Sequence, residues 1–318
     1  MLGKNYTSMT VHSKKLINAF IFLVVFLIII NIAFSPQAIF ANVLNSLELW
    51  VFKVYPPIFI FYILSSLIIN VPFFHNRVSK LFRIINFRSS HERTIFSLSL
   101  FLGNPATSAL ISENIHQNKI KIEDGNKLLC ISSFLNPLFI ISFLGSTFNN
   151  YKITIAILLI HILSNFILAY FVLRNNSYSN SINHVEINHS NLIIEIFDSI
   201  ERANYLLIKV CGIIVTSNLC KFAIQNILIK LNLHNPLVYL FLALIEVTSG
   251  LYDIINLNLP VKLTLSLIAF LISFGGLSIH LQVYAMIINT RLSFKRFFLF
   301  RMLQGLISFI LCFIVFSI

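Results

Sequence analysis

Long apolar runs, separated by short basic or polar stretches, dominate this chain and restrict what it can fold into. The run over residues 16–34 is nearly uninterrupted hydrocarbon and follows Lys14 and Lys15. A transmembrane helix needs about 20 such residues, whereas the apolar core of a signal peptide usually has only about 7–15. We therefore expect an uncleaved first membrane helix whose N-terminus lies inside.

The composition extends this expectation to the whole chain. Of its 318 residues, 57% are apolar and only 11% are charged, and a soluble fold could not hide that much apolar surface. The formal net charge is +12, but the basic residues lie between apolar runs, as cytoplasmic loops require, and not on one soluble face. The lipid bilayer is thus the expected partner, and nucleic acid is not.

The other apolar runs predict an all-α integral membrane protein with about seven transmembrane helices and two re-entrant hairpins. The hairpins are expected over residues 95–112 and 237–257, because polar residues with glycine or proline interrupt both runs. Broken backbone at membrane depth is tolerated only against protein or a water-filled cavity. The predicted transmembrane helices cover residues 16–34, 47–70, 128–147, 152–173, 204–229, 263–289 and 298–318.

The charge distribution gives these segments a direction. Arg77, Lys80, Arg88 and Arg93 follow the second predicted helix, whereas residues 35–47 contain no Lys or Arg. With both hairpins re-entrant, every basic cluster falls on the cytoplasmic side. The two halves then run in opposite directions, which is the inverted-repeat architecture of many secondary transporters. We assign residues 1–44 to an N-terminal segment with the first helix, 45–173 and 204–318 to two membrane repeats, and 174–203 to a polar cytoplasmic linker.

Four polar clusters lie within the apolar segments, face each other in this arrangement and form the candidate site. They are GNPATS at 103–108, SSFLNP at 132–137, EVTSG at 246–250 and GGLSIHLQ at 275–282. Broken helix ends offer amide donors and carbonyl acceptors without formal charge, which suits a polar solute. The predicted substrate-binding residues are Gly103, Asn104, Pro105, Thr107, Ser108, Asn136, Glu246, Thr248, Ser249, Gly250, Gly275, Gly276, Ser278, His280 and Gln282.

Several of these residues also have a structural interpretation. Glu246 either binds solute or couples protons, or it only caps a broken helix end. Asn136 either binds solute or satisfies a carbonyl that Pro137 leaves free, and His280 is more often a histidine bonded to a neighbouring helix. Lys209 and Lys221 either snorkel or pair with Glu246.

Enzyme and metal signatures are missing from the sequence. His91 and Glu92 lack the second histidine of HExxH, and there is no GxSxG or P-loop. The four cysteines lie in apolar segments without a CxxC pair. His184 and His189 belong to a polar stretch that we interpret as a solvated connector. We expect no enzyme, no catalytic residues, no cofactor and no metal.

Five stretches in their order resemble the YlbJ-type sporulation integral membrane proteins of the nucleoside-recognition (Gate) domain superfamily. The stretches are PPIFIFYILSSLI at 56–68, LGNPATSALI at 102–111, NKLLCISSFLNPLFIISFLG at 126–145, LIEVTSG at 244–250 and FGGLSIHLQV at 274–283. The resemblance covers the chain from about residue 45 onward and makes each membrane repeat Gate-like. One departure is the run Leu102, Gly103, Asn104 and Pro105, where the family usually has Ser-Gly-Tyr-Pro.

The resemblance implies a transporter-like protein related to nucleoside transporters, in a family associated with moving dipicolinate across the outer forespore membrane. We expect a secondary transporter or facilitator of a small polar, aromatic or heterocyclic solute in the bacterial cell membrane, or in the outer forespore membrane if the organism sporulates. The alternative is a non-transporting membrane scaffold or a gate subunit of a larger complex. A coupling ion, proton or sodium, and assembly into a homo-oligomer stay open.

Overall fold

The computed structural model describes residues 11–82, 85–174, 192–233 and 235–317, and within them every regular element is a helix. The helices are α1 (Val11–Phe34), α2 (Pro36–Leu49), the π-helical η1 (Trp50–Val54), α3 (Tyr55–Asn70), α4 (Pro72–Val78), α5 (Ser90–Leu102), α6 (Ala106–His116), α7 (Ile122–Ile131), α8 (Pro137–Phe148), α9 (Tyr151–Leu173), α10 (Leu192–Lys230), α11 (Pro236–Ile245), α12 (Val247–Ile255), α13 (Val261–Phe274), α14 (Gly276–Ile287) and α15 (Phe294–Val315).

Length and composition make this bundle compatible with an all-α membrane protein. In the described residues, 5 helical stretches are long and apolar enough to cross a bilayer: Pro36–Asn70, Tyr151–Leu173, Leu192–Lys230, Val261–Ile287 and Phe294–Val315. Large apolar side chains also point outward: Phe34, Leu237 and Val261 are 75%, 72% and 71% exposed. A contiguous apolar exterior is costly in water and favourable in lipid.

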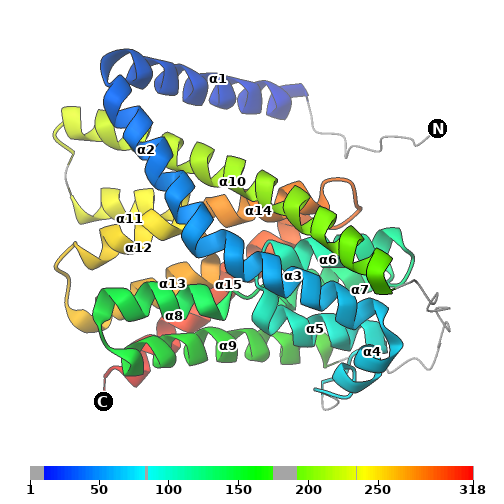
Figure 1. Ribbon diagram of the computed structural model, residues 1–318. Helices are drawn as coiled ribbons and strands as arrows, with labels where there is room; N and C mark the ends of the chain where they lie inside the picture. The colour runs from blue at the N-terminus through cyan, green and yellow to red at the C-terminus, as the bar shows by residue number, and fades with distance from the viewer. Residues whose placement is uncertain (1–10, 83–84, 175–191, 234, 318) are drawn as a thin grey trace.

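The helix ends gather at two opposite ends of the bundle (Figure 1). Helix α4, the α6–α7 and α14–α15 connections and the start of α10 lie at one end; the α1–α2 and α8–α9 connections and the end of α15 lie at the other. The first group contains Arg77, Lys119, Lys121, Arg291 and Lys295. Lys152, Lys230 and Lys262 lie at the start of α9, the end of α10 and the start of α13, which belong to the opposite end of the bundle. The cytoplasmic placement of the first end by the positive-inside rule stays a prediction.

The expected helix breaks in the first and second hairpin segments are confirmed. Gly103 has a φ of 69° and ends α5, and α6 begins only after Pro105. Glu246 has extended backbone between α11 and α12. The placement of these helix pairs as re-entrant hairpins in a bilayer stays a prediction.

The prediction of one uninterrupted helix over 128–147 is wrong. Helix α7 ends at Ile131 and α8 begins at Pro137, so residues 132–136 interrupt the run. The cause is Pro137, which has no N–H to donate, together with Asn136, whose side chain caps α8. The expected helix over 263–289 is likewise interrupted at Gly275, which has a φ of 91°.

The boundary between the linker and the second repeat also differs from the expectation. Helix α10 starts at Leu192, earlier than the predicted residue 204, and therefore includes part of the segment assigned to the linker. His184 and His189 lie outside the described residues.

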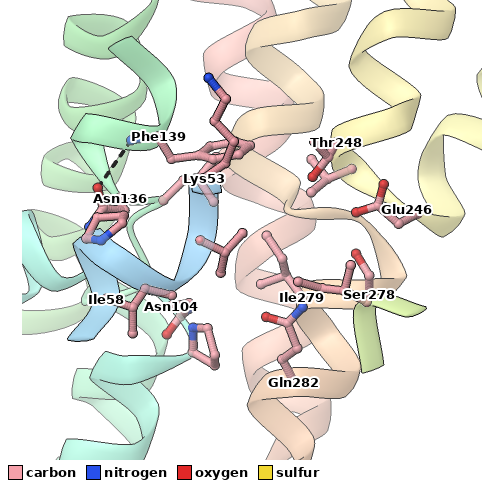
Figure 2. A pocket seen from close by; sticks show the side chains of 16 residues that line it. Lys53, Ile58, Asn104, Asn136, Phe139, Glu246, Thr248, Ser278, Ile279 and Gln282 are labelled. Atoms are coloured by element: carbon pink, nitrogen blue, oxygen red, sulfur yellow. Dashed lines mark hydrogen bonds between the residues drawn. The ribbon is translucent and has the colours of Figure 1, made fainter. Parts of the chain in front are cut away.

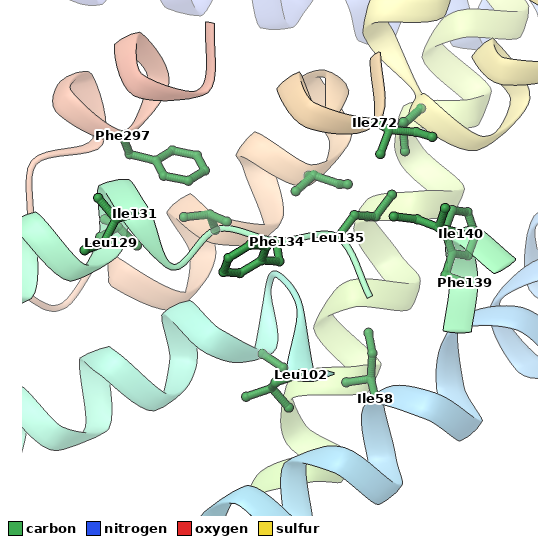
Figure 3. Close-up of a cluster of buried hydrophobic side chains, with 14 of the residues drawn as sticks. Ile58, Leu102, Leu129, Ile131, Phe134, Leu135, Phe139, Ile140, Ile272 and Phe297 are labelled. Atoms are coloured by element: carbon green, nitrogen blue, oxygen red, sulfur yellow. The ribbon is translucent and has the colours of Figure 1, made fainter. Parts of the chain in front are cut away.

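The hydrophobic core centres on the interruption between α7 and α8 (Figure 3). Phe134 and Leu135 come from this interruption and are 1% and 8% exposed. Around them lie Leu102 from the end of α5, Ile58 from α3 and Phe297 from α15. Because the core joins residues far apart in sequence, it fixes the positions of the broken helix ends.

The topology can be tested by labelling single cysteines with a membrane-impermeant thiol reagent in intact cells. Gln117 follows α6 and Gln37 lies in the first turn of α2, and both side chains are exposed. Gln37→Cys should be labelled from outside, and Gln117→Cys only after the membrane is permeabilised, because an odd number of crossings separates them. Labelling of both variants from the same side would contradict the inverted-repeat topology. The unsubstituted chain, whose cysteines are buried or half-buried, serves as the background.

Candidate functional site

One pocket brings together residues from all four polar clusters (Figure 2). It has a volume of about 50 Å³, which holds a few water molecules, since one needs roughly 10–15 Å³. The lining residues are Lys53, Val54, Pro57, Ile58, Asn104, Pro105, Leu135, Asn136, Phe139, Ile214, Glu246, Val247, Thr248, Ser278, Ile279 and Gln282.

About half of the predicted site residues line this pocket. They are Asn104, Pro105, Asn136, Glu246, Thr248, Ser278 and Gln282. The others lie in the same segments but behind the pocket wall: Gly103, Thr107, Ser108, Ser249, Gly250, Gly275, Gly276 and His280. The polar clusters were therefore correct indicators of location, while the assignment of every polar residue in them to the wall was too broad.

Sequence reasoning missed the apolar wall and Lys53. Lys53 lies in η1, and its ammonium points away from the labelled polar groups in Figure 2. Pro56 and Pro57 occupy the first turn of α3 directly after the π-helical η1. The apolar residues of the wall resemble any other core residue in sequence, so no local signal distinguishes them.

The α5–α6 turn and the α7–α8 interruption interlock through the backbone. A Cβ on Gly103 would lie 2.6 Å from the backbone nitrogen of Asn136, so only glycine fits. The Asn104 N–H donates to the Phe134 carbonyl at 2.7 Å, and the Asn136 side chain donates to the Phe101 carbonyl at 2.9 Å. These contacts fix Asn104 relative to Asn136 across the pocket.

Asn136 has a clear structural role. Its Oδ1 accepts from the Leu138 and Phe139 N–H groups at 2.9 and 3.3 Å, which caps the start of α8. With its Nδ2 bonded to Phe101, both ends of the carboxamide are engaged. Asn136 therefore lines the pocket mainly as part of its frame.

Glu246 caps the start of α12 and is 1% exposed. Its Oε2 accepts from the Ser249 N–H at 2.7 Å and from the Ser249 hydroxyl at 2.9 Å. The capping interpretation is thus correct, yet Glu246 also lies in the pocket wall. Gly250 allows this hairpin to close, because a Cβ there would lie 2.6 Å from the Ala243 backbone.

The expected pairing of Lys221 with Glu246 is indirect. Lys221 forms an ion pair with Asp253 at 2.6 Å and donates to the Ser249 hydroxyl at 2.7 Å, so Ser249 stands between Lys221 and Glu246. Lys209 lies elsewhere, with its ammonium 4.1 Å from the centre of the Tyr205 ring.

His280 belongs to the packing behind the pocket. Its Nδ1 bonds to the Gly276 carbonyl within α14, and its ring packs against Phe274, Phe297 and Phe298 with centroids 4.6 to 5.2 Å apart. His280 is thus a packing residue, but its hydrogen bond lies within α14 and not with a neighbouring helix as the sequence interpretation expected.

Arg301 of α15 holds the end of α7 in place. It is 2% exposed and donates to the carbonyls of Cys130 and Ser133 and to the side chains of Asn165 and Gln304. The C-terminus of a helix carries partial negative charge, which compensates the guanidinium. Arg301 thereby satisfies carbonyls that the break in the helix leaves free.

His161 of α9 holds the rest of the interruption. Its Nε2 accepts from the Leu135 N–H at 3.0 Å, and its Nδ1 bonds to the Ser273 hydroxyl at 2.9 Å. Ser273 also bonds to Ser308 at 2.7 Å. This buried polar network joins α9, α13 and α15 to the segment that presents Asn136 to the pocket.

A cluster of charged side chains lies away from the pocket, at the end of the bundle that contains α4 and the α6–α7 connection. Arg202 pairs with Glu195 at 2.6 Å and with Glu113, at the end of α6, at 3.5 Å. Burial raises the pKa of the Glu113 carboxyl, and the Arg202 guanidinium opposes that rise. Lys119 donates to Asn70 at 2.9 Å, and burial lowers the pKa of its ammonium. The cluster ties the first hairpin to α3 and α10.

Two polar atoms of the pocket wall have no partner within the described residues. They are the Oδ1 of Asn104 and the hydroxyl of Ser278, both buried. An unsatisfied buried polar atom costs about 1–3 kcal/mol, so these two atoms mark where a bound molecule would gain hydrogen bonds.

Comparison with family models, curated proteins and solved structures gave no match.

The role of Arg301 can be tested by thermal or denaturant unfolding in detergent. Arg301→Ala leaves carbonyls and amide oxygens unpartnered in the bundle interior and should lower the free energy of unfolding by about 2–5 kcal/mol. Arg296→Ala, at an exposed position of the same helix, should change it by less than about 0.5 kcal/mol. Equal effects of the two substitutions would show that Arg301 does not stabilise the α7–α8 interruption.

Proposed function

We propose that this chain is a secondary transporter or facilitator of a small polar solute, and that the pocket between the broken helices is its solute site. The convergence of four helix starts carries the proposal. Pro105, Asn136 and Glu246 directly precede α6, α8 and α12, Ser278 lies in the first turn of α14, and all four residues line the pocket.

The groups at the pocket suit a solute with hydrogen-bond acceptors, a donor for the Asn104 Oδ1, and apolar surface. Helix starts carry partial positive charge and favour carbonyl or carboxylate oxygens. The Ser278 hydroxyl and Asn104 Oδ1 are free to bond, while Ile58, Phe139 and Ile279 supply apolar contacts. A small aromatic or heterocyclic molecule with polar substituents fits this combination.

The order of elements supports a transport role for this site. In each half a helix pair with a sharp turn precedes a spanning run that is interrupted near its middle: α5–α6 before α7–α8, and α11–α12 before α13–α14. In Figure 1 the first pair opens toward the end with the basic connections and the second toward the opposite end. Inverted units with broken helices are a plan on which alternating access is built.

The size of the pocket requires movement during transport. Its volume of about 50 Å³ is too small for an aromatic solute. The two hairpins must therefore part from the interrupted helices to admit one, and a contact between packed half-helices is the place where such rearrangement can occur.

Uptake into liposomes that contain the purified protein tests the proposal. Radiolabelled dipicolinate and uridine are suitable probes, because the family resemblance points to these two solute classes. We expect uptake of one of them above the level of protein-free liposomes, with saturation. Absence of saturable uptake of both would favour the alternative of a membrane scaffold or gate subunit.

Ser278 provides a test that separates binding from stability. Its hydroxyl has no partner among the described residues, so Ser278→Ala should leave the unfolding midpoint unchanged and raise the apparent KM of uptake roughly 5- to 10-fold. The matched control is Ser273→Ala, which removes the bonds to His161 and Ser308 and should lower stability by about 1–2 kcal/mol. A loss of stability in Ser278→Ala without a change in KM would argue against this site.

Glu246 tests the coupling mechanism. Glu246→Gln keeps an oxygen that can accept from the Ser249 N–H, so the variant should insert and fold normally. Loss of the charge should reduce the uptake rate about 10- to 100-fold, since a charge-assisted hydrogen bond contributes about 1.5–3 kcal/mol. Wild-type rate, KM and pH profile together would restrict Glu246 to the capping of α12.

A further inference from the structure

A second, larger hollow lies between α10, α11 and α14. It has a volume of about 670 Å³, and its lining is almost entirely apolar. Phe241, Leu277 and Leu281 in its wall are 57%, 43% and 52% exposed, so the hollow is a groove open to the outside of the bundle. Among the described residues its lining also includes Lys209, Gly212, Thr216, Ile224 and Ile245.

The groove and the pocket share their walls. Ile245 lines the groove and Glu246 the pocket, Leu277 lines the groove and Ser278 the pocket, and Leu281 lines the groove. The neighbouring Gln282 again faces the pocket. A molecule in the groove would therefore press directly on the back of the half-helices that frame the candidate solute site.

Gly212 makes the groove deep. A Cβ built on Gly212 meets nothing within 4 Å, in contrast to Gly103 and Gly250, whose Cβ positions are occupied by backbone. Here the missing side chain leaves open space and is not required for close backbone packing. A bulkier residue at this position would fill the groove without disturbing the bundle.

The shape of the groove favours a narrow, flexible occupant. A second copy of the chain related by a two-fold axis through this face would place groove against groove and leave a void between them. A hydrocarbon chain can follow the concave floor and bury apolar surface along its length. A membrane supplies such chains from every side.

Lys209 is the one basic residue in this lining within the described part of the chain. Lys209 has no carboxylate within ion-pair distance among the described residues, and its ammonium lies over the Tyr205 ring, one turn closer to the start of α10. A lysine that extends along a membrane helix in this way directs its charge toward the headgroups. The start of α10 lies at the end of the bundle with the basic connections.

We propose that this groove binds an anionic phospholipid, with an acyl chain along Gly212, Thr216 and Ile224 and the phosphate at Lys209. The lipid packs against α11 and α14. It therefore influences whether the second hairpin, α11–α12, separates from α14. The lipid site requires only that the bundle is embedded in a bilayer and stands whether or not the pocket transports a solute.

Native mass spectrometry of the protein released from mixed micelles of phosphatidylglycerol and phosphatidylcholine tests the site. The wild-type chain should retain one phosphatidylglycerol in preference to phosphatidylcholine. Lys209→Gln should remove the preference, and Gly212→Leu should remove most of the retained lipid. The matched controls are Lys262→Gln, whose ammonium lies over Phe313 at 3.6 Å outside the groove, and Leu159→Phe on the exposed face of α9.

Equal retention of the two lipids by the wild-type chain would overturn the proposal, as would equal retention of phosphatidylglycerol by Lys209→Gln and Lys262→Gln. A dimer in light scattering that dissociates in Gly212→Leu would show that a second copy occupies the groove, and would likewise overturn it. If Gly212→Leu does not fold, Thr216→Leu at the next exposed turn of α10 replaces it. Because lipid retention is measured without solute, failure of this proposal is distinct from failure of transport.

Discussion

The structure depends on how the free backbone groups of broken helices are satisfied inside an apolar bundle. Each break leaves carbonyls or N–H groups that neither lipid nor neighbouring apolar side chains can bond. Side chains satisfy three of these ends: Glu246 caps the start of α12, Asn136 caps the start of α8, and Arg301 bonds to carbonyls at the end of α7. The starts of α6 and α14 have no side-chain cap. Without these partners the half-helices could not end in the middle of the bundle, and no polar pocket could exist there.

The same constraint divides the polar residues into two groups. Arg301, His161 and Ser273 lie outside the pocket lining and hold the backbone that leads to Asn136. The Ser278 hydroxyl and the Asn104 carboxamide oxygen are left without protein partners in the wall. Unpartnered buried atoms also occur away from the pocket among the described residues, for example on Ser132, His280 and Arg301, so what distinguishes Ser278 and Asn104 is their place in the pocket wall.

The sequence predicted the location of the site better than its construction. Glycine, proline and carboxylate amid apolar residues revealed the breaks at 103–105 and 246, because these residue types act locally on the helix. The interruption at 132–136 was predicted to be part of a continuous helix although Asn136 and Pro137 are local signals of a helix start. The residues that hold the rest of it, Arg301 and His161, are distant in sequence and gave no local signal. Lys53 and the apolar wall were missed for the same reason: only the packing of α3, α8 and α10 brings them to the pocket.

Adjacent residues of α11 and α14 face two different environments, and this joins the pocket to the exterior of the bundle. Ile245 and Leu277 contact the groove while Glu246 and Ser278 contact the pocket. If α11 or α14 moves away from the pocket, the wall of the groove must move with it, because each helix borders both. Packed interiors rearrange between discrete states and do not deform continuously. Whatever fills the groove therefore has a differential contact with the open and closed arrangements, which is the condition for it to shift their populations. In the proposed transport cycle, the surface that lines the groove is therefore part of the moving machinery and not only its boundary.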